Sequence, residues 1–263
     1  MKRAAATPKL HWPSPPPRET LALGSDELQL WCAALSEFRD EVARFVTLLS
    51  EAERSKASGF HFPAHRDSYI LRHGILRILL SGYRKQHPRD IEFSFRPLGK
   101  PELKDGLPQA PLHFSHSHSG DLALYAITRS CPVGVDVECL KPVPDMDQIV
   151  RQFFSSQEIQ ALAALPEEER LHAFYACWTR KEACLKVDGE GISQGVKHVD
   201  FSHTLLQETK TLETVGDLQR PDRWRLQSLA PAAGYLGAVA YERPALRVTQ
   251  WSLPASLALI CAT

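Results

Sequence analysis

Gly134-Val135-Asp136-Val137-Glu138 alternates valines with acids, and this period of two predicts a β-strand. Side chains alternate between the faces of a strand, so Asp136 and Glu138 share one face and the two valines share the other. The carboxylates leave the backbone ~6.6 Å apart, twice the rise per residue of a strand. At an effective dielectric constant of about 20, two such charges repel by about 2.5 kcal/mol. A cation that prefers oxygen ligands, Mg²⁺ or Mn²⁺, would offset this repulsion, whereas a solvated acidic face is the simpler alternative.

A second informative stretch, Trp178 to Lys186, reads WTRKEACLK and predicts a helix. Trp178, Glu182 and Lys186 recur every four residues and therefore lie along one stripe of this helix, with Lys181 on its flank. Glu182 is a candidate third metal ligand or general base, and Lys186 is a candidate phosphate contact. The alternative is an ordinary amphipathic helix in which Glu182 and Lys186 form a pair worth about 0.2–0.5 kcal/mol.

Two earlier segments add candidates for binding a polyphosphate. Arg96–Pro101 reads RPLGKP, a turn-rich loop with Lys100, and Phe114–Gly120 reads FSHSHSG, a cluster of hydroxyl and imidazole groups. In order and spacing, the four segments resemble the surfactin-type (Sfp-type) 4'-phosphopantetheinyl transferases. The resemblance extends from about Leu28 to Tyr241. It depends mainly on the strand and the helix occurring together, since a Gly-Lys-Pro loop alone is weak evidence.

The resemblance implies an α+β fold of two similar α/β lobes related by pseudo-twofold symmetry, with the cofactor in the cleft between them. The pattern agrees, because each half of the sequence reads as strand, helices and then strands. We expect residues 1–22, which are rich in proline, to form a flexible extension. Residues 23–131 would form the N-terminal lobe, and residues 132–263 the C-terminal lobe with the metal and catalytic residues.

Short sequence motifs predict where several helices begin. Ser50 with Glu53, and Ser155 with Glu158, resemble capping boxes at helix N-termini. A longer helix is expected to begin at Pro63, because proline is tolerated in the first turn.

The same resemblance implies transfer of the 4'-phosphopantetheine arm of coenzyme A to a serine of an apo acyl or peptidyl carrier protein, releasing adenosine 3',5'-bisphosphate. Such transferases activate carrier proteins of fatty acid, polyketide or nonribosomal peptide synthesis. Asp136, Glu138 and Glu182 would bind Mg²⁺, with Mn²⁺ as the other candidate. Glu182, Lys186 and His118 would be the catalytic residues, with Glu182 accepting the serine proton directly or through a water.

Basic and hydroxyl side chains would hold coenzyme A. The residues that match cofactor-binding positions of the family are Lys56, Arg66, Lys100, Ser117, His118, Lys181 and Lys186. His116 departs from the family, which more often has an uncharged residue there, so a transition-metal site with His118 is an alternative to a hydrogen-bonded histidine. The candidates for docking a carrier protein are Arg151, Phe153, Phe154 and Arg180.

The sequence is also compatible with two other functions. A module that binds coenzyme A without turnover would show nucleotide binding and no transfer to apo carrier proteins. A metal hydrolase using His116, His118, Asp136 and Glu138 would release phosphopantetheine or phosphate without a protein acceptor.

The composition of the chain bears on whether it binds nucleic acid or a membrane. The 263 residues contain 31 Lys plus Arg and 31 Asp plus Glu, so overall charge gives no argument for nucleic acid binding. The N-terminus lacks the apolar run of a secretory signal, and no apolar stretch approaches the ~18 residues needed to cross a bilayer. The six cysteines form no C-x-x-C pair and are expected to be reduced. We therefore expect a cytoplasmic protein without a membrane partner, and a monomer, because a two-lobed chain completes its own cleft.

Overall fold

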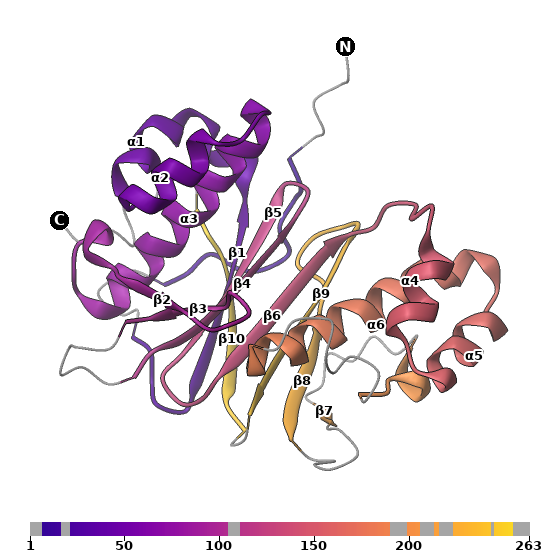
Figure 1. Cartoon of the computed structure of the whole chain (residues 1–263). Coiled ribbons are helices and arrows are strands. Elements are labelled where there is room, and N and C mark those ends of the chain that lie inside the picture. Colours follow the sequence, from indigo (N-terminus) through magenta and orange to yellow (C-terminus); the bar gives the residue numbers. More distant parts are fainter. Residues whose placement is uncertain are drawn as a thin grey trace.

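The computed structural model describes residues 7–16, 22–104, 111–189, 199–205, 213–215, 223–242 and 245–254. In this part of the chain, the strands form two four-stranded sheets and one two-stranded hairpin, flanked by helices (Figure 1). The combination of helices with largely antiparallel sheets confirms the predicted α+β class. None of the helices described is long and apolar enough to cross a membrane.

The first sheet has the strand order β10-β1-β5-β4. Its strands are β1 (Glu27–Ala34), β4 (His113–Ser119), β5 (Leu122–Thr128) and β10 (Arg247–Ser252). β1, β5 and β4 pair in antiparallel fashion, while β10 runs parallel to β1. The last strand described therefore completes the sheet that the first strand begins.

Three helices, α1 (Val42–Leu48), α2 (Glu51–Ser58) and α3 (Pro63–Arg84), lie on one side of this sheet (Figure 1). α3 begins at Pro63, as predicted. α2 begins with the predicted capping box: Glu53 N donates to Ser50 Oγ at 3.2 Å, and Ser50 N donates to Glu53 Oε2 at 2.8 Å. Gly74 lets α3 approach α1 closely, because a Cβ there would lie 2.1 Å from Phe45 Cδ1.

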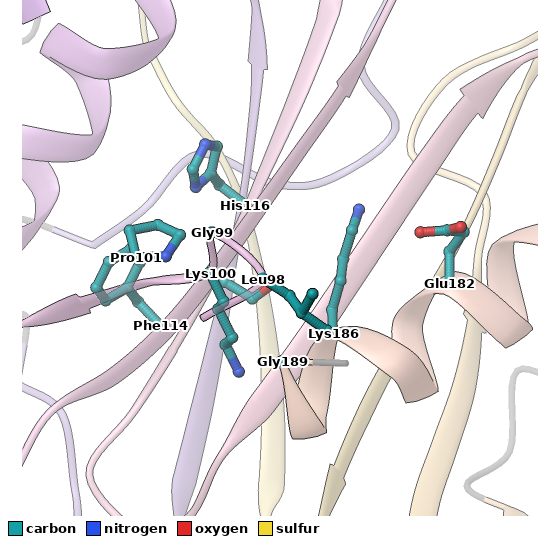
Figure 2. Close-up of a pocket in the computed structure, with 10 residues that line it drawn as sticks. Leu98, Gly99, Lys100, Pro101, Phe114, His116, Glu182, Lys186 and Gly189 are labelled. Carbon is teal, nitrogen blue, oxygen red and sulfur yellow. The ribbon is translucent and has the colours of Figure 1, made fainter. Parts of the chain in front are cut away.

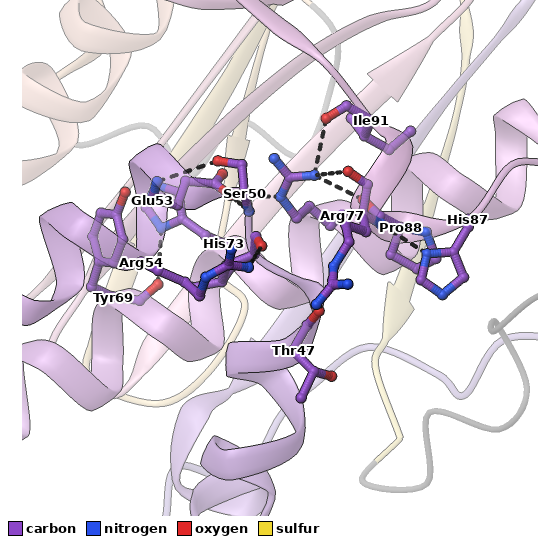
Figure 3. A network of polar contacts seen from close by, with 12 residues as sticks. Thr47, Ser50, Glu53, Arg54, Tyr69, His73, Arg77, His87, Pro88 and Ile91 are labelled. Atoms are coloured by element: carbon purple, nitrogen blue, oxygen red, sulfur yellow. Dashed lines mark hydrogen bonds and ion pairs between the residues drawn. The ribbon is translucent and has the colours of Figure 1, made fainter.

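A buried arginine joins these helices to the segment that follows them (Figure 3). Arg77 of α3 donates from Nε to Glu53 Oε2 at 2.7 Å, and from Nη1 to the carbonyl oxygens of Pro88 and Ile91 at 2.8 and 2.9 Å. Pro88–Asp90 is a short 3₁₀ turn that leads to the hairpin of β2 (Phe93–Phe95) and β3 (Pro101–Leu103). The arginine thus fixes the start of this hairpin against α2 and α3.

The second sheet has the strand order β6-β9-β8-β7 and is antiparallel throughout. Its strands are β6 (Val133–Cys139), β7 (Glu213–Val215), β8 (Trp224–Leu229) and β9 (Tyr235–Glu242). The associated helices are α4 (Met146–Phe153), α5 (Ser156–Ala164) and α6 (Glu167–Asp188). α5 begins with the second predicted capping box, in which Glu158 N donates to Ser155 Oγ at 3.0 Å and Ser155 N donates to Glu158 Oε2 at 2.7 Å.

Apolar side chains form three clusters, one between α3 and the first sheet, one around α6, and one between the two sheets. Val133, Val135 and Val137 are fully buried in the cluster between the sheets. The predicted alternation along β6 is therefore confirmed: the valines face the other sheet, and Asp136 and Glu138 lie on the opposite face, which carries α6.

The N-terminal segment packs against the body of the protein. Leu10 forms a β-bridge with Ala232, beside β9, and Trp12 is buried between the sheets. Ser252 Oγ of β10 donates to the Trp12 carbonyl oxygen at 2.6 Å. The prediction of a flexible extension is therefore wrong for residues 7–16, and residues 1–6 and 17–21 lie outside the described ranges.

The last strand described, β10, returns from the second half of the chain to the first sheet. β10 pairs with β1 from Glu27↔Arg247 to Cys32↔Ser252, so it belongs to the first sheet. β6, at Val133–Cys139, begins the second sheet, but β10 belongs to the first sheet, so the prediction that residues 132–263 form one lobe is wrong for residues 247–252. The two ends of the described chain are thus exchanged between the halves.

Candidate active site

The two sheets meet along β4 and β6, and serine side chains join these strands. Val135 N donates to Ser115 Oγ at 3.1 Å, Ser117 Oγ donates to Asp136 Oδ1 at 2.7 Å, and Ser119 Oγ donates to Glu138 Oε2 at 2.6 Å. We call this contact the serine seam. Because the serines occupy every second position of β4, they all face β6. The seam therefore fixes both acids of β6 at the boundary between the lobes.

The histidines at the intervening positions of β4 face α3 instead. The ring of His116 stacks on Tyr125 and lies edge-on to His73, with centroids 6.3 and 5.8 Å apart. Burial lowers the pKa of His116 well below its usual value, so the ring is neutral. His116 is therefore a packed aromatic side chain. Within the ranges described, no three His, Cys, Asp or Glu side chains are placed to hold a metal ion, which gives the transition-metal alternative no support.

His118 is joined to an arginine that sequence reasoning missed. Arg72 Nη1 lies 3.0 Å from His118 Nδ1. Arginine is only a donor, so Nδ1 accepts this hydrogen bond and the imidazole proton resides on Nε2. Burial and then the Arg72 charge lower the pKa of His118 to about 4, so the ring is neutral at pH 7. Arg72 and His118 both line a cavity of about 1140 Å³ between α3 and the second sheet.

A glycine allows α6 to lie directly on β6. A Cβ at Gly134 would be 2.0 Å from the carbonyl oxygen of Ala183 and 2.8 Å from Val187 N, both of them backbone atoms of α6. Any larger residue would push the helix away from the strand. Gly134 thus sets the distance between α6 and β6, and with it the position of the α6 side chains relative to β6.

Lys186 bridges the helix to the seam. Its Nζ lies 2.6 Å from Asp136 Oδ1, 3.1 Å from Ser117 Oγ and 3.2 Å from the carbonyl oxygen of Val135. Asp136 is 4% exposed, and its second oxygen, Oδ2, is buried and has no hydrogen-bond partner among the described residues. A buried carboxylate oxygen without a partner is costly, so it points to a ligand that the protein atoms do not supply.

Glu182 lies one helical turn before Lys186 and lines a smaller cavity of about 240 Å³ with it (Figure 2). The pKa of Glu182 is raised to about 7: burial is the largest cause, the Lys186 charge opposes it, and the charges of Asp136 and Glu138 add to it. Burial likewise raises the pKa of Glu138, and the neighbouring Asp136 charge adds to the shift. The three acids therefore repel one another across the seam, although among the described residues they are not drawn together into a preformed metal site.

Comparison with known proteins identifies the fold family. A 4'-phosphopantetheinyl transferase of Nostoc sp. (strain PCC 7120), HetI, is 34% identical over 229 residues, which cover 87% of this chain and 92% of the relative. The chain belongs to the 4'-phosphopantetheinyl transferase superfamily. Residues 132–240 match the sequence profile of that superfamily. The transferase Sfp of Bacillus subtilis (strain 168) is 31% identical over 206 residues, or 78% of this chain and 88% of the relative.

In this transferase, the remaining predicted cofactor contacts occupy three different environments. Arg66 is exposed at the start of α3 and pairs with Asp67 at 2.9 Å. Lys56 is exposed on α2, with Nζ 5.6 Å from the centre of the Tyr69 ring. The amino group of Lys100 points away from that of Lys186 (Figure 2) and donates to two backbone carbonyls.

Lys181 does not belong to the cofactor site of the transferase. It is 1% exposed, and its Nζ lies 2.9 Å from Glu158 Oε2 and 2.6 Å from the carbonyl oxygen of Val199. The ammonium group is thus enclosed between α5, α6 and the segment after residue 198. The prediction that it contacts the cofactor is wrong, because the ammonium group is buried and is engaged by Glu158 and the Val199 carbonyl.

Two of the four docking candidates are also interior residues. Phe154 is 1% exposed and stacks on Phe174, and Arg180 is 1% exposed and donates to Ser228 Oγ and to the Thr204 carbonyl oxygen. Phe153 is half-buried against Trp178, with ring centroids 5.7 Å apart, and Arg151 is exposed. Arg151 and Phe153 remain candidates for contacts with a carrier protein.

Proposed function

We propose that the transferase moves the 4'-phosphopantetheine arm of coenzyme A to a serine of an apo acyl or peptidyl carrier protein. The observation that carries the proposal is the group formed by Asp136, Glu182 and Lys186 at the serine seam. It combines an acid with an unpartnered buried oxygen, an acid of raised pKa and a cation, and the last two line a cavity. These are the groups that phosphoryl transfer to a hydroxyl requires.

The chemical step joins the serine Oγ to the β-phosphorus of coenzyme A. The bond from this phosphorus to the bridging oxygen breaks, and the electron pair leaves with the 5'-phosphate of adenosine 3',5'-bisphosphate. Glu182 takes the serine proton, a role suited to a carboxyl whose pKa of about 7 is matched to neutral pH. Lys186 stabilises the charge that gathers on the pyrophosphate oxygens.

Asp136, Glu138 and Glu182 would hold Mg²⁺, or Mn²⁺ in its place. The oxygen donors suit a hard cation, and the unpartnered Asp136 Oδ2 is the observation that supports binding there. When bound, such an ion screens the charge of the pyrophosphate. Lys186 now occupies Asp136 Oδ1, so a cation would compete with this ammonium group or bind at Oδ2 beside it.

His118 and Arg72 would bind the phosphates of the nucleotide. The neutral His118 presents Nε2–H as a donor, and Arg72 adds a positive charge that has no acidic partner among the described residues. Ser117 contributes a hydroxyl beside Lys186. Arg66 and Lys56 lie nearer the surface at the start of α3 and on α2, where they would contact the 3'-phosphate.

The pathway and setting are further parts of the proposal. The carrier protein would serve fatty acid, polyketide or nonribosomal peptide synthesis. The free cysteines among the described residues support a cytoplasmic setting, because thiols stay reduced there. One chain supplies every group named above, which supports a monomer.

We expect coenzyme A and Mg²⁺ to add a phosphopantetheine group to an apo carrier protein, and removal of the metal with a chelator to stop the reaction. The measurement is mass spectrometry of fatty acid and peptide carrier proteins, with the carrier Ser→Ala variant as control. Nucleotide binding without labelling of several carriers would favour a binding module. Release of phosphopantetheine without a carrier would favour a hydrolase.

The raised pKa of Glu182 predicts how stability depends on pH in the metal-free protein. The folded carboxyl titrates at about 7 and the unfolded one near 4.5, so the folded state binds more protons between these values. This residue therefore makes stability fall as pH rises from about 4.5 to about 7. Denaturant unfolding across this range should show a steeper decline for the wild type than for Glu182→Gln. Parallel pH profiles would contradict the prediction.

A further inference from the structure

The last turn of α6 is held by the hairpin between β2 and β3. Arg96 Nη1 donates to the carbonyl oxygen of Asp188 at 2.7 Å, and Lys100 Nζ donates to that of Val187 at 3.0 Å. The final carbonyls of a helix have no partner within the helix, and cations stabilise this end. The two side chains therefore form a C-terminal cap that comes from a distant part of the chain.

Gly189 provides the space for this cap. It ends α6 with φ of 71°, the left-handed region that favours glycine. A Cβ there would lie 2.8 Å from Arg96 Cδ and 3.3 Å from Lys100 Cδ. The glycine thus serves both the backbone turn and the approach of the two capping side chains.

The hairpin fixes both side chains. Arg96 N donates to the Lys100 carbonyl oxygen at 2.9 Å, and Gly99 N donates to the Arg96 carbonyl oxygen at 2.8 Å, which closes the tip. Arg96 Nε also donates to Glu102 Oε1 at 2.6 Å, so an acid of β3 orients the guanidinium. Lys100 Nζ reaches the Val133 carbonyl oxygen at 3.3 Å, which ties the start of β6 to the end of α6.

We infer that Arg96 and Lys100 are positioning residues, which cap α6 and thereby hold Lys186 and Glu182 over β6, and that the Lys100 ammonium does not contact the nucleotide. Lys186 is next in sequence to the capped Val187, and Glu182 lies one turn further in. Loss of the cap would therefore displace Lys186 first. Burial lowers the pKa of Lys100 to about 8, in keeping with an enclosed ammonium group.

Three full-length variants test the inference. Lys100→Met removes the cation, and Gly189→Ala blocks the cap without changing any charge. Lys104→Met is the control, because Lys104 is exposed at the base of the same hairpin and pairs with Glu92 at 2.8 Å. The measurements are amide hydrogen exchange of the last turn of α6, calorimetric binding of adenosine 3',5'-bisphosphate, and kcat for carrier labelling.

We expect Lys100→Met and Gly189→Ala each to speed exchange of this turn and to lower kcat by about tenfold, with the nucleotide Kd changed less than about twofold. Lys100→Arg should restore part of kcat, and Lys104→Met should behave as wild type. Lys100→Met with unchanged exchange, or with a nucleotide Kd raised about tenfold, would overturn the inference. Only the kcat readout rests on the proposed function, so absence of labelling by the wild type would leave exchange and binding as the decisive measurements.

Discussion

Glu182→Gln should lower kcat for carrier labelling by about 10²- to 10⁴-fold, the range that a positioned general base contributes. The amide has nearly the shape of the carboxyl, but it cannot accept the serine proton and is a weaker oxygen ligand. Nucleotide affinity should change far less, because His118 and Arg72 lie on the other side of the seam, next to α3. Steady-state labelling and calorimetric binding of adenosine 3',5'-bisphosphate measure the two effects separately.

Glu168→Gln is the matched control. It makes the same change in the exposed first turn of α6, more than three turns from Glu182. Labelling at the wild-type rate by Glu182→Gln, or an equal loss in both variants, would remove Glu182 from its proposed role.

The second large effect concerns stability: Lys181→Met should reduce the free energy of unfolding by about 3–5 kcal/mol. Breaking a buried ion pair by removing one partner leaves the other charge uncompensated. Glu158 is fully buried, and it accepts from Phe201 N at 2.9 Å as well as from Lys181. Without the lysine, the carboxylate would have to stay charged in an apolar cluster or take up a proton.

A double variant separates the charge effect from loss of packing. Lys181→Met with Glu158→Gln removes both charges and keeps an amide that can accept from Phe201 N. Urea unfolding should therefore show a smaller loss for the double variant than for Lys181→Met alone. If the double variant were the less stable of the two, the ion pair would not be the cause.

Local signals in the sequence were sufficient for several features of the fold. The capping boxes at Ser50 and Ser155, the start of α3 at Pro63 and the two faces of β6 were all predicted correctly. Each depends on residues within a few positions of one another, and the geometry of a helix or strand relates such positions directly.

The environments of Lys181 and Lys100 depend on contacts that spacing along the chain does not encode. α6 is buried on most sides, so the stripe through Glu182 and Lys186 did not reveal that Lys181 faces Glu158. Lys100 meets the end of α6, 87 residues further along the chain. Arg72 has no motif of its own, and only the packing of α3 beside β4 brings it to His118.

The exchange of chain ends has a consequence for how this enzyme could be divided. A cut after residue 131 would give one fragment in which β1 keeps β5 but loses β10, and another in which β10 has no strand to pair with. The first fragment would also keep Trp12, whose burial needs residues of both fragments. We therefore expect neither piece to fold on its own, and activity to return only when the two are mixed and each supplies what the other lacks.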